Sequence, residues 1–511
     1  MRMGNYSIRF RTGMLLAAIL LGFLGLYALT AQRDLAWQDS GVRQWRVLVG
    51  DYIGVDGTAL SHPLYIGMAR AFVYGCPLGS PLWRVNLFSG VGMALALVCL
   101  AVLVHRLTGS RRAAAGAAVL LGLAHMPWWL ATVTEVYTWS LAGFLLELVL
   151  LQALLAAPCR RTLVMLALVS GLGVSIHDLA LLALPVYLVV IVGLIRGGQL
   201  AWRALGWGAL AYGVGSAPFL ALVVQDVWVR QRLGAAIASA LFGESFFRQV
   251  VGCGMNSWAV ANAGLFLLNF ASPCWLLALV GLRVARYRVA PAFRLALLAL
   301  TVIHALFFMR YFVADQALFA LPILGLLAIW AGLGFGWLVD GVWRRQVWYG
   351  LAVVALLLPP LLYWGAWRVV VAGELVPRRA RALPFRDEAR YWLLPWKHNE
   401  HSASAFAQEV FAQCGSNDVV YTDATVAGPL LVTRWMNSTG PSVPWVVTYY
   451  DRWNPEREAG HELMDRLTNR AFYVVSPVAG YMPAGLSTGA YAFVRTGVLY
   501  RVVARGTDIK R

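Results

Sequence analysis

Charged residues are scarce in this chain. Only 13% of its 511 residues are charged, whereas 60% are hydrophobic, and the mean hydropathy is +0.66. Ordinary soluble domains carry roughly 25% charged and 45–50% apolar residues, so a soluble enzyme and a disordered regulator fit poorly. Cysteine is rare as well. The six cysteines show no CxxC or metal-ligand spacing, which argues against a disulfide framework and a zinc site.

Long apolar runs explain this composition. A membrane-spanning helix needs about 20 mostly apolar residues, and the sequence predicts about 11 such helices. They cover residues 13–31, 84–104, 113–128, 136–156, 162–176, 179–195, 204–224, 259–281, 293–309, 317–338 and 347–367. The first run also has features of a signal peptide, although its cleavage signal is weak. We therefore expect a polytopic α-helical membrane protein.

Arginine is distributed unevenly between the loops. With the N-terminus in the cytoplasm, the cytoplasmic segments hold sixteen arginines and one acid, and the opposite face up to residue 367 holds nine of each. Positive loops face the cytoplasm, so the net charge of +18 is a topology signal. This distribution argues against a nucleic-acid partner. It predicts a membrane protein whose C-terminus lies outside the cytoplasm.

Residues 368–511 differ in composition from the predicted membrane domain, residues 1–367. Their 17 basic and 13 acidic residues are interspersed, as on a soluble surface. The apolar pattern predicts helices at Ser402–Cys414 and Glu456–Asn469 and strands at Asp418–Asp423, Trp445–Tyr450, Ala471–Ser476 and Tyr491–Val503. We expect a small C-terminal α/β or α+β extracytoplasmic domain.

The first predicted outer loop is the richest in polar groups. Asp39 follows the first span by a few residues, so its carboxylate should lie near the membrane surface. A carboxylate there can act as a general base toward a hydroxyl acceptor. Alternatively, Asp39-Ser40-Gly41 is only a helix cap or a turn. Apolar residues between the charges predict short helices along the membrane surface.

Other polar residues gather on the same face. His177 and Asp178 stand where the fifth span meets the sixth, and they either contact a phosphate or an acceptor, or Asp178 caps the sixth span. Glu135 begins the fourth span, where an acid also suits the helix dipole. The preceding Trp128-Trp129 pair is expected in the interfacial aromatic belt rather than in a site.

Two outer arginines are candidates for holding a lipid phosphate. Arg248 lies in the second long outer loop, and Arg310 follows the ninth span. Arginine suits phosphate because its planar fork donates two parallel hydrogen bonds. A snorkelling membrane anchor is the alternative for outer arginines in general, and a structural pair with Asp315 is the alternative for Arg310.

Acids are nearly absent from the predicted spans, where only Glu147 lies at depth. A proton-coupled transporter usually carries more acids there, and no two matching halves contain broken helices, the usual sign of a secondary transporter. Polar groups at the outer surface favour chemistry on a substrate with a lipid tail and a polar head.

Three stretches in these loops resemble a known family. They are Asp39-Ser40-Gly41 with His62-Pro63-Leu64-Tyr65; Trp83-Arg84-Val85-Asn86-Leu87 with Trp128-Trp129 and Glu135-Val136-Tyr137; and Asp315-Gln316 through Leu321-Pro322 to Trp330–Gly334. Their order and spacing resemble a bacterial branch of the GT-C glycosyltransferases. This branch is related to protein O-mannosyltransferases and to the transmembrane O-mannosyltransferase of plexin-type receptors. Two departures are Val42, where the family often has Glu, and a shortened stretch after His62-Pro63.

The resemblance implies inverting transfer of a sugar, with mannose as one candidate, from a polyprenyl-phosphate donor. The acceptor would be a protein, lipid or glycan outside the cytoplasm. Asp39 matches the family's catalytic acid. The candidates for donor or acceptor binding are His62, Glu135, His177, Asp178, Arg248, Arg310 and Asp315. No metal ligand is assigned, and a divalent metal is compatible with this chemistry. The alternatives are a flippase or exporter of lipid-linked envelope glycans and a non-catalytic subunit of an envelope glycan machine.

Overall fold

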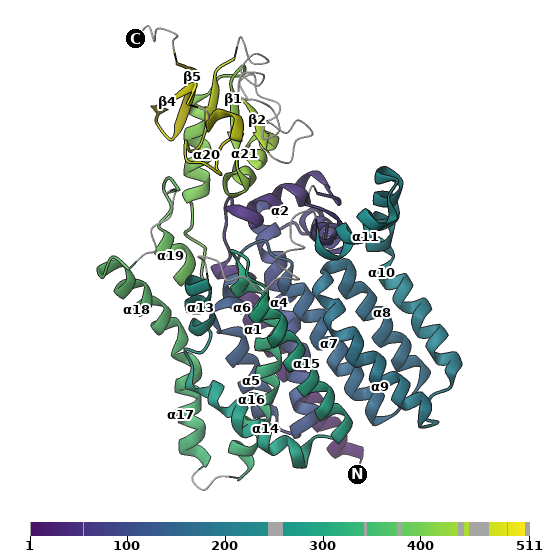
Figure 1. The fold of residues 1–511 in the computed structure, drawn as a ribbon. Coiled ribbons are helices and arrows are strands. Elements are labelled where there is room, and N and C mark those ends of the chain that lie inside the picture. The colour runs from purple at the N-terminus through teal and green to yellow at the C-terminus, as the bar shows by residue number, and fades with distance from the viewer. Residues whose placement is uncertain are drawn as a thin grey trace.

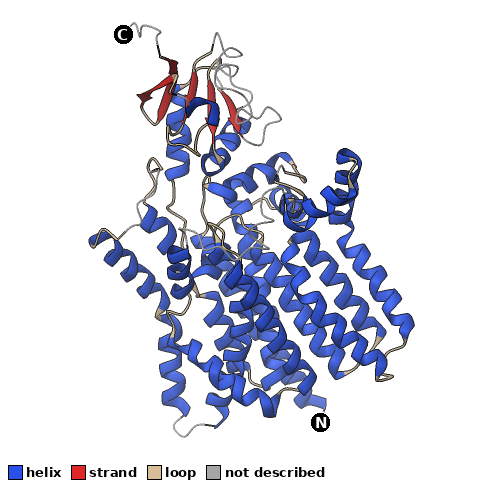
Figure 2. Cartoon of the chain, viewed as in Figure 1, coloured by secondary structure: helices blue, strands red, loops and turns tan. Residues whose placement is uncertain are grey.

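The computed structural model describes residues 2–54, 56–243, 259–341, 345–375, 381, 383–437, 444–448, 470–487 and 489–505. Long helices form a bundle, and a small sheet with two helices lies beyond one end of it (Figure 1). Figure 2 shows that strands occur only in this second part of the described chain. The N-terminus lies at the end of the bundle opposite the sheet (Figure 1).

The bundle consists of helices from both halves of residues 1–372. The first group is α1 (Arg2–Thr30), α4 (Pro81–Thr108), α5 (Arg111–Gly122), α6 (His125–Ala131), α7 (Tyr137–Ala156), α8 (Arg160–Ile176), α9 (Leu184–Arg196) and α10 (Trp202–Arg230). The second group is α13 (Ala259–Leu268), α14 (Leu277–Arg288), α15 (Pro291–Arg310), α16 (Leu321–Gly341), α17 (Arg345–Leu357) and α18 (Pro359–Ala372).

Most of the predicted spans are helices of sufficient length. Within the described residues, eight helices are long and apolar enough to cross a membrane, or ten if each of two bent pairs is one span. The pair α5 and α6 bends by 71°, and α13 bends by 90° against the segment Pro273–Arg288. The predicted span 162–176 corresponds to α8, which has only 17 residues. The multi-pass architecture is confirmed, and the number eleven stays a prediction.

Close backbone contacts hold neighbouring helices together. A Cβ atom added at Gly171 of α8 would lie 2.3 Å from the carbonyl oxygen of Tyr212 in α10. One added at Gly281 of α14 would lie 1.7 Å from the carbonyl oxygen of Trp330 in α16. Small residues let helix backbones approach within a bilayer, where the hydrophobic effect drives no association between helices. These glycines therefore fix the packing of two helix pairs.

Short helices cover the end of the bundle that faces the sheet. Among them are α2 (Gln38–Val49), α3 (Pro63–Gly75) and α11 (Leu233–Phe242), and α2 and α11 are labelled there in Figure 1. The short helices expected in the first outer loop are therefore present. Buried Arg46 ties the loop together, because its guanidinium donates to the carbonyl oxygens of Leu60 (3.1 Å) and Ser61 (2.7 Å).

The C-terminal sheet is mixed. Its strands are β1 (Val419–Thr422), β2 (Trp445–Thr448), β3 (Phe472–Val474), β4 (Tyr491–Thr496) and β5 (Leu499–Ala504), in the order β2-β1-β3-β5-β4. β1 is parallel to β2 and β3, whereas β5 is antiparallel to β3 and β4. The predicted single strand Tyr491–Val503 is wrong, because Thr496 and Leu499 pair across a tight hairpin.

The helices of this region are α19 (Glu388–Leu393), α20 (Ser402–Gln413) and α21 (Ala424–Met436). The helix expected near Ser402 is present as α20, whereas the one expected at Glu456–Asn469 lies outside the described residues. The sequence analysis missed α21, which begins after Asp423, whose side chain accepts from the backbone N–H of Thr425. α21 packs against α2 of the first outer loop (Figure 1).

Candidate functional site

A cavity of about 400 Å³ lies where the first outer loop meets the bundle. Its wall includes α2, the turn before α7, the junction of α8 with the 3₁₀ turn Asp178–Ala183, the junction of α15 with α16, and α19. Six residues singled out from the sequence line this one cavity: Asp39, His62, Glu135, His177, Asp178 and Asp315. They come from four separate parts of the chain.

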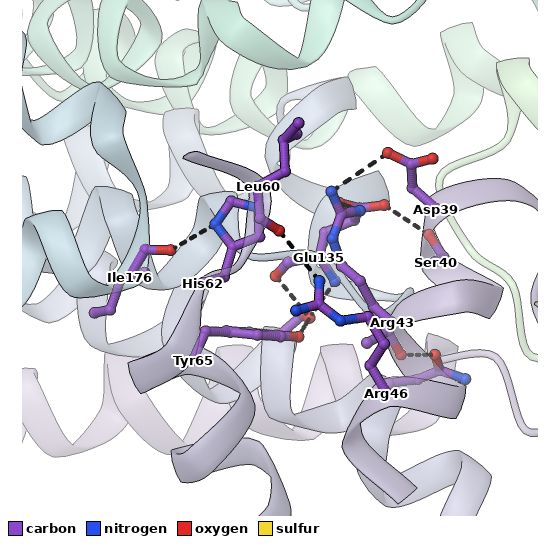
Figure 3. Close-up of polar contacts among 12 residues, drawn as sticks. Asp39, Ser40, Arg43, Arg46, Leu60, His62, Tyr65, Glu135 and Ile176 are labelled. Atoms are coloured by element: carbon purple, nitrogen blue, oxygen red, sulfur yellow. Dashed lines mark hydrogen bonds and ion pairs between the residues drawn. The ribbon is translucent and has the colours of Figure 1, made fainter. Parts of the chain in front are cut away.

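Arg43 joins two of these acids. Its Nη1 donates to Oε2 of Glu135 at 2.6 Å, and its Nη2 lies 3.4 Å from Oδ2 of Asp39 (Figure 3). Arg43 is one turn after Asp39 on α2, so helix geometry brings the two side chains to the same face. Burial lowers the pKa of Arg43, but the charges of Glu135 and Asp39 outweigh this and raise it above its ordinary value. Arg43 therefore remains cationic.

Glu135, one of the two acids that contact Arg43, is buried. Ser40 donates to its Oε1 at 2.7 Å, and its backbone N–H donates to Oγ of Ser89 on α4 at 2.8 Å. Burial raises the pKa of Glu135 to about 7, although Arg43 and the hydrogen bond from Ser40 lower it. Glu135 is thus held at both its carboxylate and its backbone, which makes it a rigid partner for Arg43.

Asp39 is arranged differently, because its side chain is 60% exposed. The helix α2 begins after Trp37, and no side chain caps it. The reading of Asp39 as a helix cap is therefore wrong. Gln38, immediately before it, has φ +57, in the left-handed region that non-glycine residues rarely occupy. The carboxylate of Asp39 is the accessible acid of the Arg43 cluster.

Two histidines line another part of the wall. The ring centroids of His62 and His177 are 5.0 Å apart. Nδ1 of His62 lies 3.0 Å from the carbonyl oxygen of Ile176 (Figure 3), which can only accept, so Nδ1 carries the proton. Burial and the charges of His177, Arg43 and Arg46 hold the pKa of His62 well below its ordinary value. Neutral His62 therefore keeps a lone pair on Nε2.

The junction at His177 also answers the question of the helix cap. His177, not Asp178, caps the 3₁₀ turn Asp178–Ala183, because its side chain accepts from the backbone N–H of Leu179. Asp178 lines the cavity and lies 2.7 Å from Nδ1 of His177. The capping alternative for Asp178 is therefore wrong, and its carboxylate faces the site.

Asp315 lies across the cavity, between α15 and α16. Burial, and after it the charge of Asp39, raise its pKa to about 6, although Arg43 and His177 lower it. Asp39 and Asp315 both line the cavity, so the first outer loop and the α15–α16 junction meet at one site.

The sequence analysis missed several residues of the wall. Tyr391 and Trp392 of α19 line the cavity, and the indole of Trp392 stacks on that of Trp129 at 5.4 Å with an interplanar angle of 8°. The belt prediction for Trp128 and Trp129 is wrong, because both are buried, and Trp129 lines the cavity. No local signal in the sequence indicates this position for Tyr391 and Trp392, because both follow the last predicted span.

Neither of the two candidate arginines is among the described residues that line the cavity. Arg310 ends α15, is exposed, and is not among the residues that line the cavity. Arg248 lies outside the described residues. Within the described part of the chain, no three His, Cys, Asp or Glu side chains form a group that could hold a metal ion.

A second cavity, of about 480 Å³, adjoins the first. The two share Gln38, Ala314, Asp315, Leu318 and Trp392 in their walls. The rest of the second cavity comes mainly from small and aliphatic residues of α13 and α18, with Glu388 as its other acid. An apolar chamber and a polar chamber therefore meet beside Asp315.

Three solved structures resemble this chain along most of its length. ArnT from Cupriavidus metallidurans bound to undecaprenyl phosphate has a TM-score of 0.62 and 14% identity, covering 97% of this chain and 98% of that one. The same protein in the apo state has a TM-score of 0.60 and 16% identity, covering 96% of this chain and 97% of that one. The third is the Archaeoglobus fulgidus oligosaccharyltransferase tethered with an acceptor peptide containing the NVT sequon. It has a TM-score of 0.50 and 12% identity, covering 91% of this chain and 69% of that one.

No protein-family model and no curated protein matches the chain. The structural likeness extends over the bundle and the C-terminal region together, since it covers 97% of the chain. At 14% identity it shows the fold and no more. This chain is a multi-pass membrane protein with the fold of the GT-C glycosyltransferases.

Proposed function

We propose that the protein is a glycosyltransferase that moves a sugar from a polyprenyl-phosphate donor to a protein, lipid or glycan acceptor. The observation that carries this proposal is the gathering of Asp39, Glu135, His62, His177, Asp178 and Asp315 around one cavity of a GT-C fold. The ArnT structure holds undecaprenyl phosphate. A polyprenyl-phosphate sugar is therefore our donor class, with mannose as one candidate sugar.

Asp39 is the proposed base because its carboxylate is the exposed one. It would accept the proton of the acceptor hydroxyl while the hydroxyl oxygen attacks the anomeric carbon. The bond from that carbon to the donor phosphate breaks, and the polyprenyl phosphate leaves with the bonding electrons. Attack from the face opposite the phosphate inverts the anomeric centre. Arg43, held by Glu135, would keep the ionised carboxylate of Asp39 in place.

The other chamber suits an apolar part of a substrate. Its walls on α13 and α18 carry small and aliphatic side chains, among them Gly264, Leu265 and Ala366. A lipid chain that enters this chamber exchanges contacts with bilayer lipid for contacts with these side chains, so packing against them, rather than removal from water, would hold it there. Its polar end would then lie beside Asp315, within the shared wall of the two cavities.

Activity in a defined system tests this function. The purified protein in nanodiscs would be incubated with a radiolabelled polyprenyl-phosphate sugar and with candidate protein, lipid and glycan acceptors. Transfer of label to an acceptor, with release of polyprenyl phosphate, is the expected result. Movement of an intact labelled lipid across proteoliposomes without bond breakage would instead establish the flippase. Activity in neither assay would favour a non-catalytic subunit.

The orientation is a separate proposal, in which the cavity faces away from the cytoplasm of a bacterial inner membrane. It is supported by the sixteen arginines in the assigned cytoplasmic segments. In a cysteine-free background, needed because Cys159 is exposed, a membrane-impermeant reagent should label a cysteine at Thr425 and not one at Arg286. The reverse labelling pattern would overturn the orientation and the location of the reaction.

A further inference from the structure

The segment that carries Asp39 is held from both sides by the C-terminal region. Before it, Trp37 donates from Nε1 to Oγ of Ser402 at 2.8 Å, in a buried contact between residues 365 positions apart. Arg386 donates from Nη1 to the side-chain amide oxygen of Gln38 at 3.4 Å. After it, Gly41 meets Gly428 of α21. These three contacts bracket Asp39 along the chain.

The contact of Gly41 with Gly428 is made between backbones. A Cβ atom added at Gly428 would lie 2.3 Å from the carbonyl carbon of Gly41 and 2.5 Å from the backbone nitrogen of Val42. One added at Gly41 would lie 3.2 Å from Cδ of Pro429. Even a methyl group at Gly428 would not fit between the two backbones, so we expect a shift of α21 to move the first turn of α2.

The contacts before Asp39 stabilise an unusual backbone. Gln38 has φ +57, and such conformations persist only where the surroundings impose them. Arg386 is itself fixed, because its buried guanidinium pairs with both carboxylate oxygens of Glu388 and lies 4.2 Å from the ring of Tyr391. Ser402 is fixed by a hydrogen bond to Glu400. The partners of Trp37 and Gln38 are thus rigid.

We infer that the C-terminal region is a positioning element for Asp39, with Ser402, Arg386 and Gly428 as positioning residues. This inference rests on the proposed role of Asp39 as the base. None of the three side chains is among those that line the cavity, so they act through the backbone of residues 37–41. A base displaced by about 1 Å can lose about 100-fold in rate without any loss of substrate binding.

Ser402 offers a matched control two residues away on the same helix. Ser404 is also buried, and its hydroxyl has no hydrogen-bond partner in the described structure. Ser402→Ala should lower kcat about 10-fold or more and leave KM for the polyprenyl donor within about twofold. Ser404→Ala should change neither, and Ser402→Thr, which keeps a hydroxyl, should recover most of kcat. Equal kcat in the Ser402→Ala and Ser404→Ala variants would overturn the inference.

Hydrogen exchange tests the same inference without any activity. Amides of residues 36–44 should exchange faster in Ser402→Ala and Gly428→Ala than in the wild type. Gly365→Ala is the control for Gly428, because a Cβ atom at Gly365 on α18 meets nothing within 4 Å. Unchanged exchange in this segment, in folded Ser402→Ala protein, would overturn the inference. If exchange rises but the wild type transfers no sugar, the proposed function fails and the positioning contact stands.

Discussion

The two acids that share Arg43 occupy opposite kinds of surroundings. Around Glu135 the structure is closed: the carboxylate is 3% exposed and accepts from Arg43 and Ser40, while the backbone is held by Ser89. Around Asp39 it is open: the carboxylate is 60% exposed and its contact with Arg43 is the longer one, at 3.4 Å. Arg43 thus pairs with one buried acid, Glu135, and one exposed acid, Asp39.

This difference in exposure favours different roles for the two acids. A general base must exchange a proton with a substrate, so it needs access as well as position. A buried, fully hydrogen-bonded acid cannot reach a substrate without breaking its contacts. It can fix the orientation of the arginine that steadies the exposed acid. The comparison therefore supports the proposed role of Asp39 in the chemistry, and under that proposal Glu135 holds the site together, a contrast that mutation can test.

Replacement of Asp39 should have the largest effect. Asp39→Asn should leave a folded, membrane-inserted protein and reduce turnover by about 10²–10⁴-fold, the usual contribution of a positioned proton acceptor. Turnover would be measured in nanodiscs with saturating donor, and folding by thermal unfolding. Near-normal turnover would remove Asp39 from the chemistry and direct attention to the other acids of the cavity wall, Glu135, Asp178 and Asp315.

Replacement of Glu135 should act mainly on stability. Glu135→Ala removes the carboxylate that accepts from Arg43 and Ser40 and leaves a cavity at a buried position, which should cost about 3 kcal/mol. We expect a clear drop in the midpoint of thermal unfolding at pH 8. Ser40→Ala, which removes only one hydrogen bond to Glu135, should cost about 1 kcal/mol. A Glu135→Ala protein of wild-type stability that lacks activity would reverse the assignment of roles.

The pH dependence of the free energy of unfolding tests the interaction between exposed Asp39 and Asp315. The pKa of Asp315 is raised from 3.8 to about 6 in the folded protein. The folded state therefore binds this proton more tightly than the unfolded state, and the free energy of unfolding falls as the pH rises from about 4 to about 6. Asp315→Asn removes this contribution.

That variant should unfold about 2 °C higher than the wild type at pH 7.5, with little difference at pH 4. Thermal unfolding followed by tryptophan fluorescence at a series of pH values measures this difference. The same substitution in an Asp39→Asn background should give a smaller gain, because the charge of Asp39 contributes to the raised pKa. Equal gains in both backgrounds would show that the two acids do not interact.

Arg310 lies outside the surroundings of Glu135 and of Asp39, and its replacement should have the smallest effect. It is exposed at the end of α15 and does not line the cavity. Arg310→Ala should change KM for the polyprenyl donor by less than about threefold and leave kcat unaltered. Arg310→Lys is the matched control for charge. A large rise in KM with Ala that Lys does not restore would instead establish a contact of its planar fork with the donor phosphate.

The sequence predicted the membrane bundle well because apolar runs report burial in lipid directly. It failed where apolar runs do not determine geometry. The run 113–128 is one hydrophobic stretch, yet α5 and α6 meet at 71°. Likewise, the run 491–503 is one pattern of apolar residues, yet residues 497 and 498 form a tight turn within it, and Gly497 there has φ +58.

The candidate site was predictable in its members but not in its contacts. Asp39, His62, Glu135, His177 and Asp178 stand in outer loops, and a common face was enough to place them together. The spacing of Arg43 from Asp39 is one helical turn and was a local signal, but its other partner, Glu135, is 92 residues away and could not be inferred from that spacing. Tyr391 and Trp392 were missed since they follow the last span and their approach depends on how the C-terminal region docks.

The length of α8 has a consequence for the surrounding lipid. Its 17 residues measure about 26 Å at 1.5 Å per residue, against about 30 Å for a typical hydrocarbon layer. A bilayer thins locally to match a short hydrophobic stretch, at modest cost per ångström. α8 ends at Ile176, directly before His177 in the wall of the cavity. Thinning at this edge would bring the lipid headgroups toward the two histidines, and under the proposed function it would bring the phosphate of a lipid-borne donor with them.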